Sequence, residues 1–118
     1  MIKRKLSGSI EFKKVFLEGK RIETKNLIVF VLNNKHKFNR LGLIVKKEIG
    51  KAVVRNKIKR RAREAYRQIN RKLFQGYDII ILVKKNVVGL KHFQLYSELE
   101  GLFYQEKIFL PGENNISS

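Results

Sequence analysis

The spacing of apolar residues alternates between stretches typical of a helix and stretches typical of a strand. Near the N-terminus, Phe12 and Phe16 lie four residues apart and share one face of a short helix, expected from residue 10 to about residue 18. Ser9 is placed to cap the start of this helix. Residues 1–8, which carry three basic side chains, are expected to form a poorly ordered arm.

Residues 27–32 form a continuous apolar run rich in β-branched side chains, which is typical of a strand covered on both faces. Residues 41–45 are predicted to form a second strand. The polar segment between them, residues 33–39, indicates that they pair as a hairpin. A third run of this kind, residues 77–83, follows Gly76 and predicts a further strand.

A long helix is predicted from residue 52 to residue 73, after the break at Gly50. At about 100° per residue, its apolar side chains form one core-facing stripe: Val54, Ile58, Ala62, Ala65, Tyr66, Ile69 and Leu73. Cations occupy the remaining arc. A last amphipathic helix is expected over residues 90–104, with Leu95, Leu99, Leu102 and Phe103 at helical spacing.

These elements predict one domain, residues 1–108, followed by a polar and disordered tail over residues 109–118. The order of helices and strands predicts an α/β (α+β) two-layer sandwich with one small sheet and a long basic helix.

Charge distinguishes this chain from an ordinary small domain. Lys and Arg number 27 against 10 Asp and Glu, a formal net charge of +17. Residues 51–72 hold ten basic side chains and one acid, whereas residues 73–118 hold four and five. The excess is therefore confined to the first 72 residues, which favours a surface that binds a polyanion such as nucleic acid.

The sequence gives little support for a metal site, a catalytic site formed by the protein itself, or a membrane helix. Cysteine is absent, which excludes disulfides and thiolate metal sites, and His36 and His92 are far apart in the chain. The carboxylates are scattered without acid–base or metal-ligand spacing, so no catalytic residue of the protein itself is expected. No apolar run reaches the ~18–20 residues of a membrane helix, and a cytoplasmic location is expected.

The long helix carries a ladder of cations at intervals of four residues: Arg55, Lys59, Arg63 and Arg67. Successive side chains of this cation ladder rise by about 6 Å, a spacing comparable to that of phosphates along a nucleic-acid strand. Arg side chains grip phosphate bidentately, and Asn56 is suited to a base edge or a 2′-hydroxyl. The alternative is a solvated helix face with no ligand.

The same segment resembles a known family. Residues 55–60 read Arg-Asn-Lys-Ile-Lys-Arg and are followed by Arg63-Glu64, which is similar to the RNR motif of the bacterial ribonuclease P protein. Residues 40–45 (Arg-Leu-Gly-Leu-Ile-Val), 12–16 (Phe-Lys-Lys-Val-Phe) and 78–81 (Asp-Ile-Ile-Ile) look like other parts of that family. The resemblance covers about residues 3–105.

The resemblance implies a fold like the second domain of a ribosomal small-subunit protein, with a left-handed β-α-β crossover. It implies ribonuclease P RNA and the 5′ leader of precursor tRNA as partners, with no membrane or DNA. Catalysis and Mg²⁺ would belong mainly to the RNA. The residues expected to contact RNA are Arg55, Asn56, Lys59, Arg60, Arg63, Arg67 and Lys47.

The chain departs from the family pattern at two places. Many members have Ser-Lys-Lys where this chain has Lys46, Lys47 and Glu48. The position after Gly50, often Asn in the family, is Lys51, which caps a helix less well than Asn. The departures bear on the detailed contacts near this surface.

Three phenylalanines, Phe12, Phe16 and Phe30, match aromatic positions that line a leader-binding cleft in the family. There they would stack on leader bases without sequence preference. The alternative is that they are ordinary core residues. Phe16 is the better candidate for stacking.

Two other functions share parts of this pattern. A ribosomal or other structural RNA-binding protein would show the same charge and fold class. A DNA-binding module would need a second helix across the backbone or a dimer seam, and neither is evident beside the basic helix. The RNR stretch and the aromatic positions favour the ribonuclease P protein.

Overall fold

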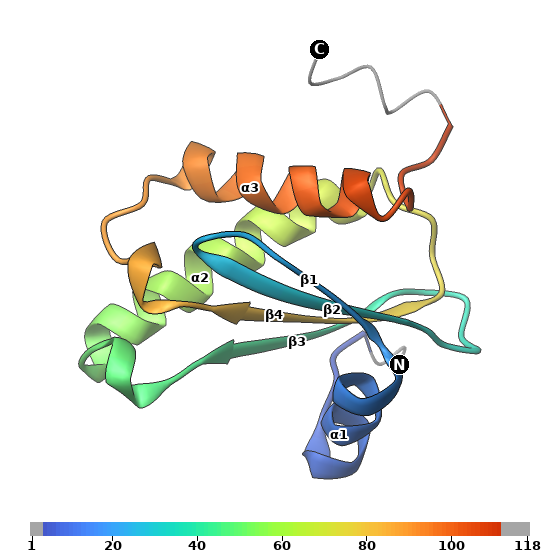
Figure 1. The fold of residues 1–118 in the computed structure, drawn as a ribbon, viewed down its shortest axis with the longest axis horizontal. Coiled ribbons are helices and arrows are strands. Elements are labelled where there is room, and N and C mark those ends of the chain that lie inside the picture. Colours follow the sequence, from blue (N-terminus) through green and yellow to red (C-terminus); the bar gives the residue numbers. More distant parts are fainter. Residues whose placement is uncertain (1–3, 112–118) are drawn as a thin grey trace.

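The computed structural model of the chain describes residues 4–111, which form a four-stranded mixed sheet with helices on both faces (Figure 1). In chain order the elements are α1 (Gly8–Glu18), β1 (Lys20–Glu23), β2 (Leu27–Asn33), β3 (Arg40–Val45), the short 3-10 turn η1 (Lys47–Ile49), α2 (Ala52–Asn70), β4 (Tyr77–Val83), a second 3-10 turn η2 (Lys85–Val87) and α3 (His92–Gln105). The predicted α/β (α+β) sandwich is confirmed.

The sheet has the order β1-β2-β4-β3, and this order makes the expected hairpin of residues 27–32 and 41–45 wrong. β4 lies between those two strands, antiparallel to β2 and parallel to β3. Its centre is the most deeply buried strand segment, because Ile79, Ile80 and Ile81 are all 0% exposed. A strand covered on both faces belongs in the middle of a sheet. β4 therefore lies between β2 and β3, although it follows both of them in the chain.

The hairpin that does form joins β1 to β2 in antiparallel register. β1 was not predicted from the sequence, because its four residues include a single apolar side chain, Ile22. An edge strand needs only one inward residue, and its outward polar residues conceal the alternation that identifies longer strands.

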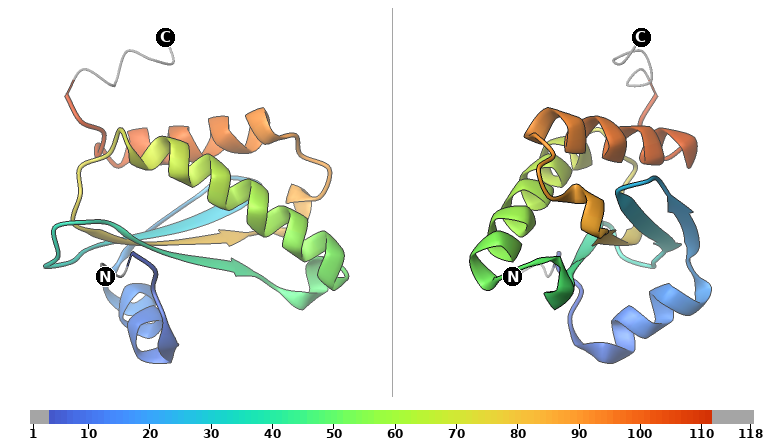
Figure 2. Two further views of the ribbon diagram at one scale, coloured as in Figure 1. Left: turned by 180° about the vertical axis from the view of Figure 1, so that it is seen from behind. Right: turned by 60° about the vertical axis from the view of Figure 1, so that its left-hand side comes forward.

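The connection from β3 through α2 to β4 is a left-handed crossover. β3 and β4 are parallel neighbours. In the rear view, α2 lies in front of the sheet, both strands point to the right, and β4 lies above β3 (Figure 2, left). Parallel crossovers are right-handed in about 98% of cases, so this hand is an exception to the general rule.

The larger core lies between the sheet and the layer formed by α2 and α3 (Figure 1). Alternate residues of β2 and β4 point into it, together with the expected stripe of α2 and the apolar residues of α3. One member of the stripe is corrected: Val54 is 36% exposed, at the start of α2 where the helix extends beyond the sheet. It packs instead beside Gly50.

The opposite face of the sheet carries α1 and a second, smaller core. Leu6, Val15 and Ile80 are its buried members, and Phe12 and Phe30 pack against them. Leu6 donates a backbone hydrogen bond to Leu41 at 2.9 Å, so the N-terminal segment from residue 4 adds to the edge of β3. The expectation of a poorly ordered arm is therefore wrong for residues 4–8, while residues 1–3 lie outside the described residues.

Several element ends differ from expectation. α1 begins after Ser7 and not after Ser9, and the Glu11 carboxylate accepts a hydrogen bond from the Ser7 backbone N–H at 2.8 Å. α2 starts after Lys51, which makes no side-chain capping hydrogen bond. Of the expected tail, Phe109 pairs with Leu73, and residues 112–118 lie outside the described residues.

α2 ends at Asn70, three residues before the predicted end, because a buried side chain holds the following turn. Asn39 is 2% exposed, and its amide oxygen accepts hydrogen bonds at 2.8 Å from the backbone N–H groups of Gly76 and Tyr77. Its amide nitrogen donates to the side chain of Asn70 at 2.8 Å and to the carbonyl of Phe74 at 3.1 Å. Asn39 thus fixes where the chain leaves α2 and enters β4.

Candidate nucleic-acid interface

The cation ladder lies along the side of α2 that faces β3 and the N-terminal segment. Lys59, Arg63 and Arg67 line a surface hollow together with Arg4 and Lys5 of the N-terminal segment. The apolar part of its lining comes from Leu6, Phe12, Leu41, Gly42 and Leu43. No acidic residue of the described chain lines this hollow, so its field attracts anions.

Two members of the ladder also make contacts within the protein. The Arg55 ε N–H donates to the carbonyl of Gly50 at 3.1 Å, which secures the start of α2. Arg67 donates two hydrogen bonds to the Glu64 carboxylate, at 3.1 and 2.8 Å. The Arg67 hydrogen bonds are the main cause that lowers the pKa of Glu64, and both side chains are exposed. Such an exposed pair contributes little to stability.

The other residues expected to bind RNA are exposed but do not all lie on the ladder side. Asn56 lies on α2 between Arg55 and Lys59, and Lys47 lies in η1 just before the helix. Arg60 is different, because it lines a separate hollow on the α3 side. The structure therefore brings most of these residues together and places Arg60 on another surface.

The three phenylalanines gather where α1 crosses the sheet. The rings of Phe16 and Phe30 meet edge to face with centroids 4.9 Å apart, and those of Phe12 and Phe16 are 6.4 Å apart. Phe12 and Phe30 are half-buried against the smaller core, whereas Phe16 is 39% exposed. Phe16 thus presents the most ring surface to a ligand. Phe12 also lines the hollow beside the cation ladder.

A partly buried ion-pair network that the sequence did not reveal fastens α1 to the sheet. Arg40 on β3 donates two hydrogen bonds to Asp78 on β4, both at 2.8 Å, and a third to Glu11 on α1 at 2.9 Å. Asn34 adds a bond to Asp78 at 2.8 Å. In the sequence, Arg40 and Asp78 are only charged residues near the start of two strands. They lie 38 residues apart, so nothing in the sequence indicated that they pair.

The ionisation of this network follows from its geometry. Burial acts to raise the pKa of Asp78, but hydrogen bonds from Arg40 and Asn34 and the charge of Arg40 outweigh it and lower that pKa. The Asp78 hydrogen bonds are the main cause that raises the pKa of Arg40. Both groups are therefore charged at neutral pH, and α1 is held by charge-assisted bonds.

The described residues offer no set of donors that fits a metal ion held by the protein alone. Within residues 4–111, no group of three or more His, Cys, Asp or Glu side chains lies close enough together to ligate one. The same residues include no helix that is both long and apolar enough to cross a membrane.

Comparisons with known proteins agree with one another. The family model described as Ribonuclease P matches residues 2–107. The chain is 37% identical over 95 residues to the Ribonuclease P protein component of Alkaliphilus oremlandii, covering 80% of this chain and 83% of the relative. It is 33% identical to that of Clostridium botulinum, covering 92% and 99%.

Solved structures show the same likeness in three dimensions. The RNase P protein of Staphylococcus aureus superposes with a TM-score of 0.84 at 27% identity, over 92% of this chain and all of that one. The RNase P protein of Thermotoga maritima gives a TM-score of 0.80 at 28% identity, over 87% and 97%. Family, relatives and fold converge: the chain belongs to the ribonuclease P protein family, the protein component of that endoribonuclease.

Proposed function

We propose that this protein binds the RNA subunit of ribonuclease P along the cation ladder and holds the 5′ leader of precursor tRNA at the phenylalanines of α1. The proposal rests on one observation: the cation ladder and the phenylalanines of α1 are neighbours on the surface. Phe12 lines the same hollow as Lys59, Arg63 and Arg67, so the aromatic and cationic surfaces are adjacent. A single-stranded segment could therefore contact both surfaces.

Each part of this surface suits a different part of RNA. The Arg and Lys side chains would bind backbone phosphates, which gives affinity without sequence preference and makes it fall with salt. Phe16 and Phe30 would stack on leader bases, and stacking tolerates any base. Asn56, exposed on α2 between two cations, would contact a 2′-hydroxyl or a base edge.

Catalysis would reside in the RNA. The described part of the chain has no carboxylate cluster for Mg²⁺, so the ions would be held mainly by the RNA subunit. The protein would contribute binding energy for the leader and would neutralise repulsion between the two RNAs. At low Mg²⁺ that neutralisation matters most, because fewer metal ions are present to provide it.

Cleavage of a 5′-extended precursor tRNA by the cognate ribonuclease P RNA at low Mg²⁺ tests the proposal. We expect accurate 5′ cleavage when the protein is added, and no cleavage by the protein alone. Tight RNA binding without any gain in cleavage would instead favour a structural RNA-binding protein. A triple variant, Arg55→Gln, Lys59→Gln and Arg63→Gln, should lose the effect while keeping its fold by circular dichroism.

A further inference from the structure

α3 differs from the rest of this basic chain, because none of its 14 residues is Lys or Arg. At about 100° per residue, four residues on its outer side fall within about 60° of one another: Phe93, Ser97, Glu100 and Tyr104. We call these four residues the α3 stripe. Phe93 is 67% exposed and Tyr104 is 46% exposed. Glu100 is the only charged member, so the stripe lacks the cations that would repel another copy of the chain.

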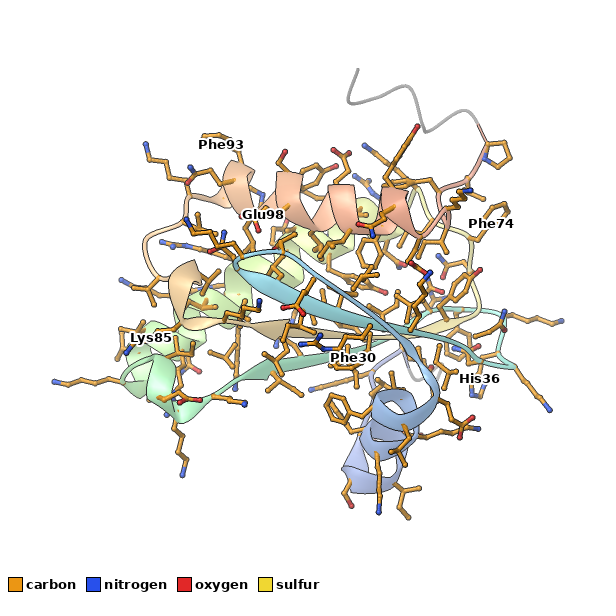
Figure 3. All side chains as sticks on the ribbon, in the orientation of Figure 1. Phe30, His36, Phe74, Lys85, Phe93 and Glu98 are labelled. Atoms are coloured by element: carbon orange, nitrogen blue, oxygen red, sulfur yellow. The ribbon has the colours of Figure 1, made fainter. Side chains whose placement is uncertain are left out.

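The two ends of the α3 stripe have complementary shapes. In the first turn of α3, the Phe93 side chain points away from the protein, at the opposite end of the molecule from Phe74 (Figure 3). Beyond the last turn, a largely apolar surface hollow is lined by Tyr104, Gln105, Lys107, Phe109, Leu110 and Pro111. The ring centroids of Tyr104 and Phe109 lie 6.0 Å apart, so the hollow offers aromatic surface to an incoming ring.

The middle of α3 permits the close approach of a second helix. Ser97 is small and exposed, and an added Cβ at Gly101, one turn further along, would meet nothing within 4 Å. The position of α3 is itself fixed, because the Glu98 carboxylate accepts hydrogen bonds from the Thr24 hydroxyl at 2.7 Å and from the Asn26 side-chain amide. A rigid surface loses little conformational freedom when a partner binds.

We propose that the α3 stripe binds a second copy of this chain, with the two α3 helices antiparallel about a twofold axis between residues 98 and 99. In this register, Phe93 of each copy faces Tyr104 of the other and enters its hollow, because the two residues are equally far from the axis. Ser97 likewise faces Glu100, so its hydroxyl can donate to that carboxylate. Such a self-complementary pairing fills both hollows at once.

The charge of the chain favours this side of the molecule for contact between two copies. Each copy carries a formal charge of +17, so surfaces rich in Lys and Arg repel one another. Within the α3 stripe the charged groups are the two Glu100 carboxylates, and each has the Ser97 hydroxyl of the partner as a donor. α3 and α1 lie on opposite faces of the sheet (Figure 1), so the pairing leaves the phenylalanines of α1 uncovered. It does not depend on which RNA the protein binds.

The dimer should be reversible and should strengthen with salt. A helix of 14 residues is about 21 Å long, so an α3 pair buries less than the roughly 800 Å² per partner of a standard interface, and we expect micromolar affinity. Salt screens the repulsion between the copies, because the Debye length falls from about 10 Å at 0.1 M to about 3 Å at 1 M. RNA binding weakens with salt, so the sign of the salt effect distinguishes self-association from association through RNA.

Sedimentation velocity of the full chain without RNA, over a micromolar concentration range at low and high sodium chloride, tests the proposal. We expect Phe93→Arg to raise the Kd of the dimer at least about tenfold, with the fold unchanged by circular dichroism. Ile10→Arg makes the same change at a residue that is 84% exposed on α1 and should leave the Kd unchanged. A wild-type protein that stays monomeric at high salt would leave this face to a different protein and would overturn the proposal, as would equal losses in both variants.

A charge-swap experiment tests the register. Tyr104→Glu alone should also weaken the dimer, whereas the double variant Phe93→Arg, Tyr104→Glu should recover it, because the introduced guanidinium and carboxylate face each other across the axis. Within one chain these positions are about 16 Å apart along the helix, so the two groups cannot pair with each other. A double variant that dimerises no better than Phe93→Arg, measured at the same salt concentration, would overturn the antiparallel pairing.

Discussion

At the residue scale, the most consequential side chains are polar groups held away from water by specific partners. Asp78 is 5% exposed, and its charge is sustained by bonds from Arg40 and Asn34. Asn39, 2% exposed, satisfies two backbone N–H groups of the turn before β4. Removing either side chain would leave its buried partners without a hydrogen bond. An unsatisfied buried polar group costs about 1–3 kcal/mol of stability.

The ionised carboxylate of Asp78 stabilises the folded protein, and this contribution is lost at acid pH. Its folded pKa is lowered, so its contribution is complete above the unfolded value of about 4 and is lost as pH falls through the folded pKa. We expect Asp78→Asn to lower the free energy of unfolding by about 2 kcal/mol at pH 7. The difference in free energy of unfolding between this variant and the wild type should become smaller toward pH 3.

Denaturant unfolding at pH 7, 5 and 3 measures this gap. Glu48→Gln, which removes an exposed carboxylate of η1, is the matched control and should leave unfolding nearly unchanged at pH 7. A gap for Asp78→Asn that stays constant down to pH 3 would mean that the Asp78 carboxylate does not titrate with folding.

Substitution of Phe16 distinguishes a role in leader binding from a role in packing. It is 39% exposed and contacts Phe30 edge to face, so Phe16→Ala should preserve the fold and weaken precursor tRNA binding by about 1–3 kcal/mol. Mature tRNA, which lacks the leader, should bind the reconstituted enzyme with unchanged affinity. Leu17→Ala removes a neighbouring side chain that is 74% exposed and serves as control. Equal losses for both tRNAs would argue for a structural Phe16.

At the element scale, the position of α1 depends on close approach to the sheet. Phe12 lies directly over Gly42 of β3, where an added Cβ would come within 2.7 Å of two ring carbons. Arg40 then ties Glu11 of α1 to the same strand. The aromatic surface therefore depends on the absence of a side chain at one strand position.

Gly42→Ala should displace Phe12 and destabilise the protein by about 1–3 kcal/mol, with weaker leader binding as a consequence. Gly101→Ala is the matched change, because a Cβ there meets nothing within 4 Å and the residue lies in α3. That variant should gain about 0.5–1 kcal/mol from helix propensity. Thermal unfolding of both variants measures the difference, and a neutral Gly42→Ala would show that α1 adjusts without cost.

At the scale of the whole molecule, the cations that give the chain its formal charge of +17 lie on separate surfaces of a small protein. The cation ladder faces β3 and the N-terminal segment, whereas Lys57 and Arg61 face α3. The large apolar core beneath α2 holds the helix together against repulsion between its own cations. RNA binding should relieve that repulsion.

Assembly with ribonuclease P RNA should therefore depend steeply on salt. We expect Arg55→Ala and Lys59→Ala each to make the salt dependence of assembly shallower by about one unit of slope. Lys25→Ala, which removes an exposed cation from the turn between β1 and β2, should leave the slope unchanged. Binding titrations at several salt concentrations measure the slopes, and unchanged slopes for both ladder variants would remove this side of α2 from the interface.

Local patterns in the sequence determined the elements that carry the candidate site. The period of apolar residues located α2 and its buried stripe, because one helix face must be apolar to pack on a sheet. The four-residue spacing of Arg55, Lys59, Arg63 and Arg67 by itself placed cations along one side of that helix. The RNR stretch indicated the family that the comparisons then showed.

Only the tertiary structure decided how those elements meet. Strand order is set by contacts across 30 or more residues, as between Arg40 and Asp78, and such contacts leave no local period in the sequence. The same reason applies to Arg60, which shares a helix with the ladder but faces α3 because of how the two helices pack. Spacing along a chain fixes a direction around one helix axis, whereas the neighbour in that direction depends on the whole fold.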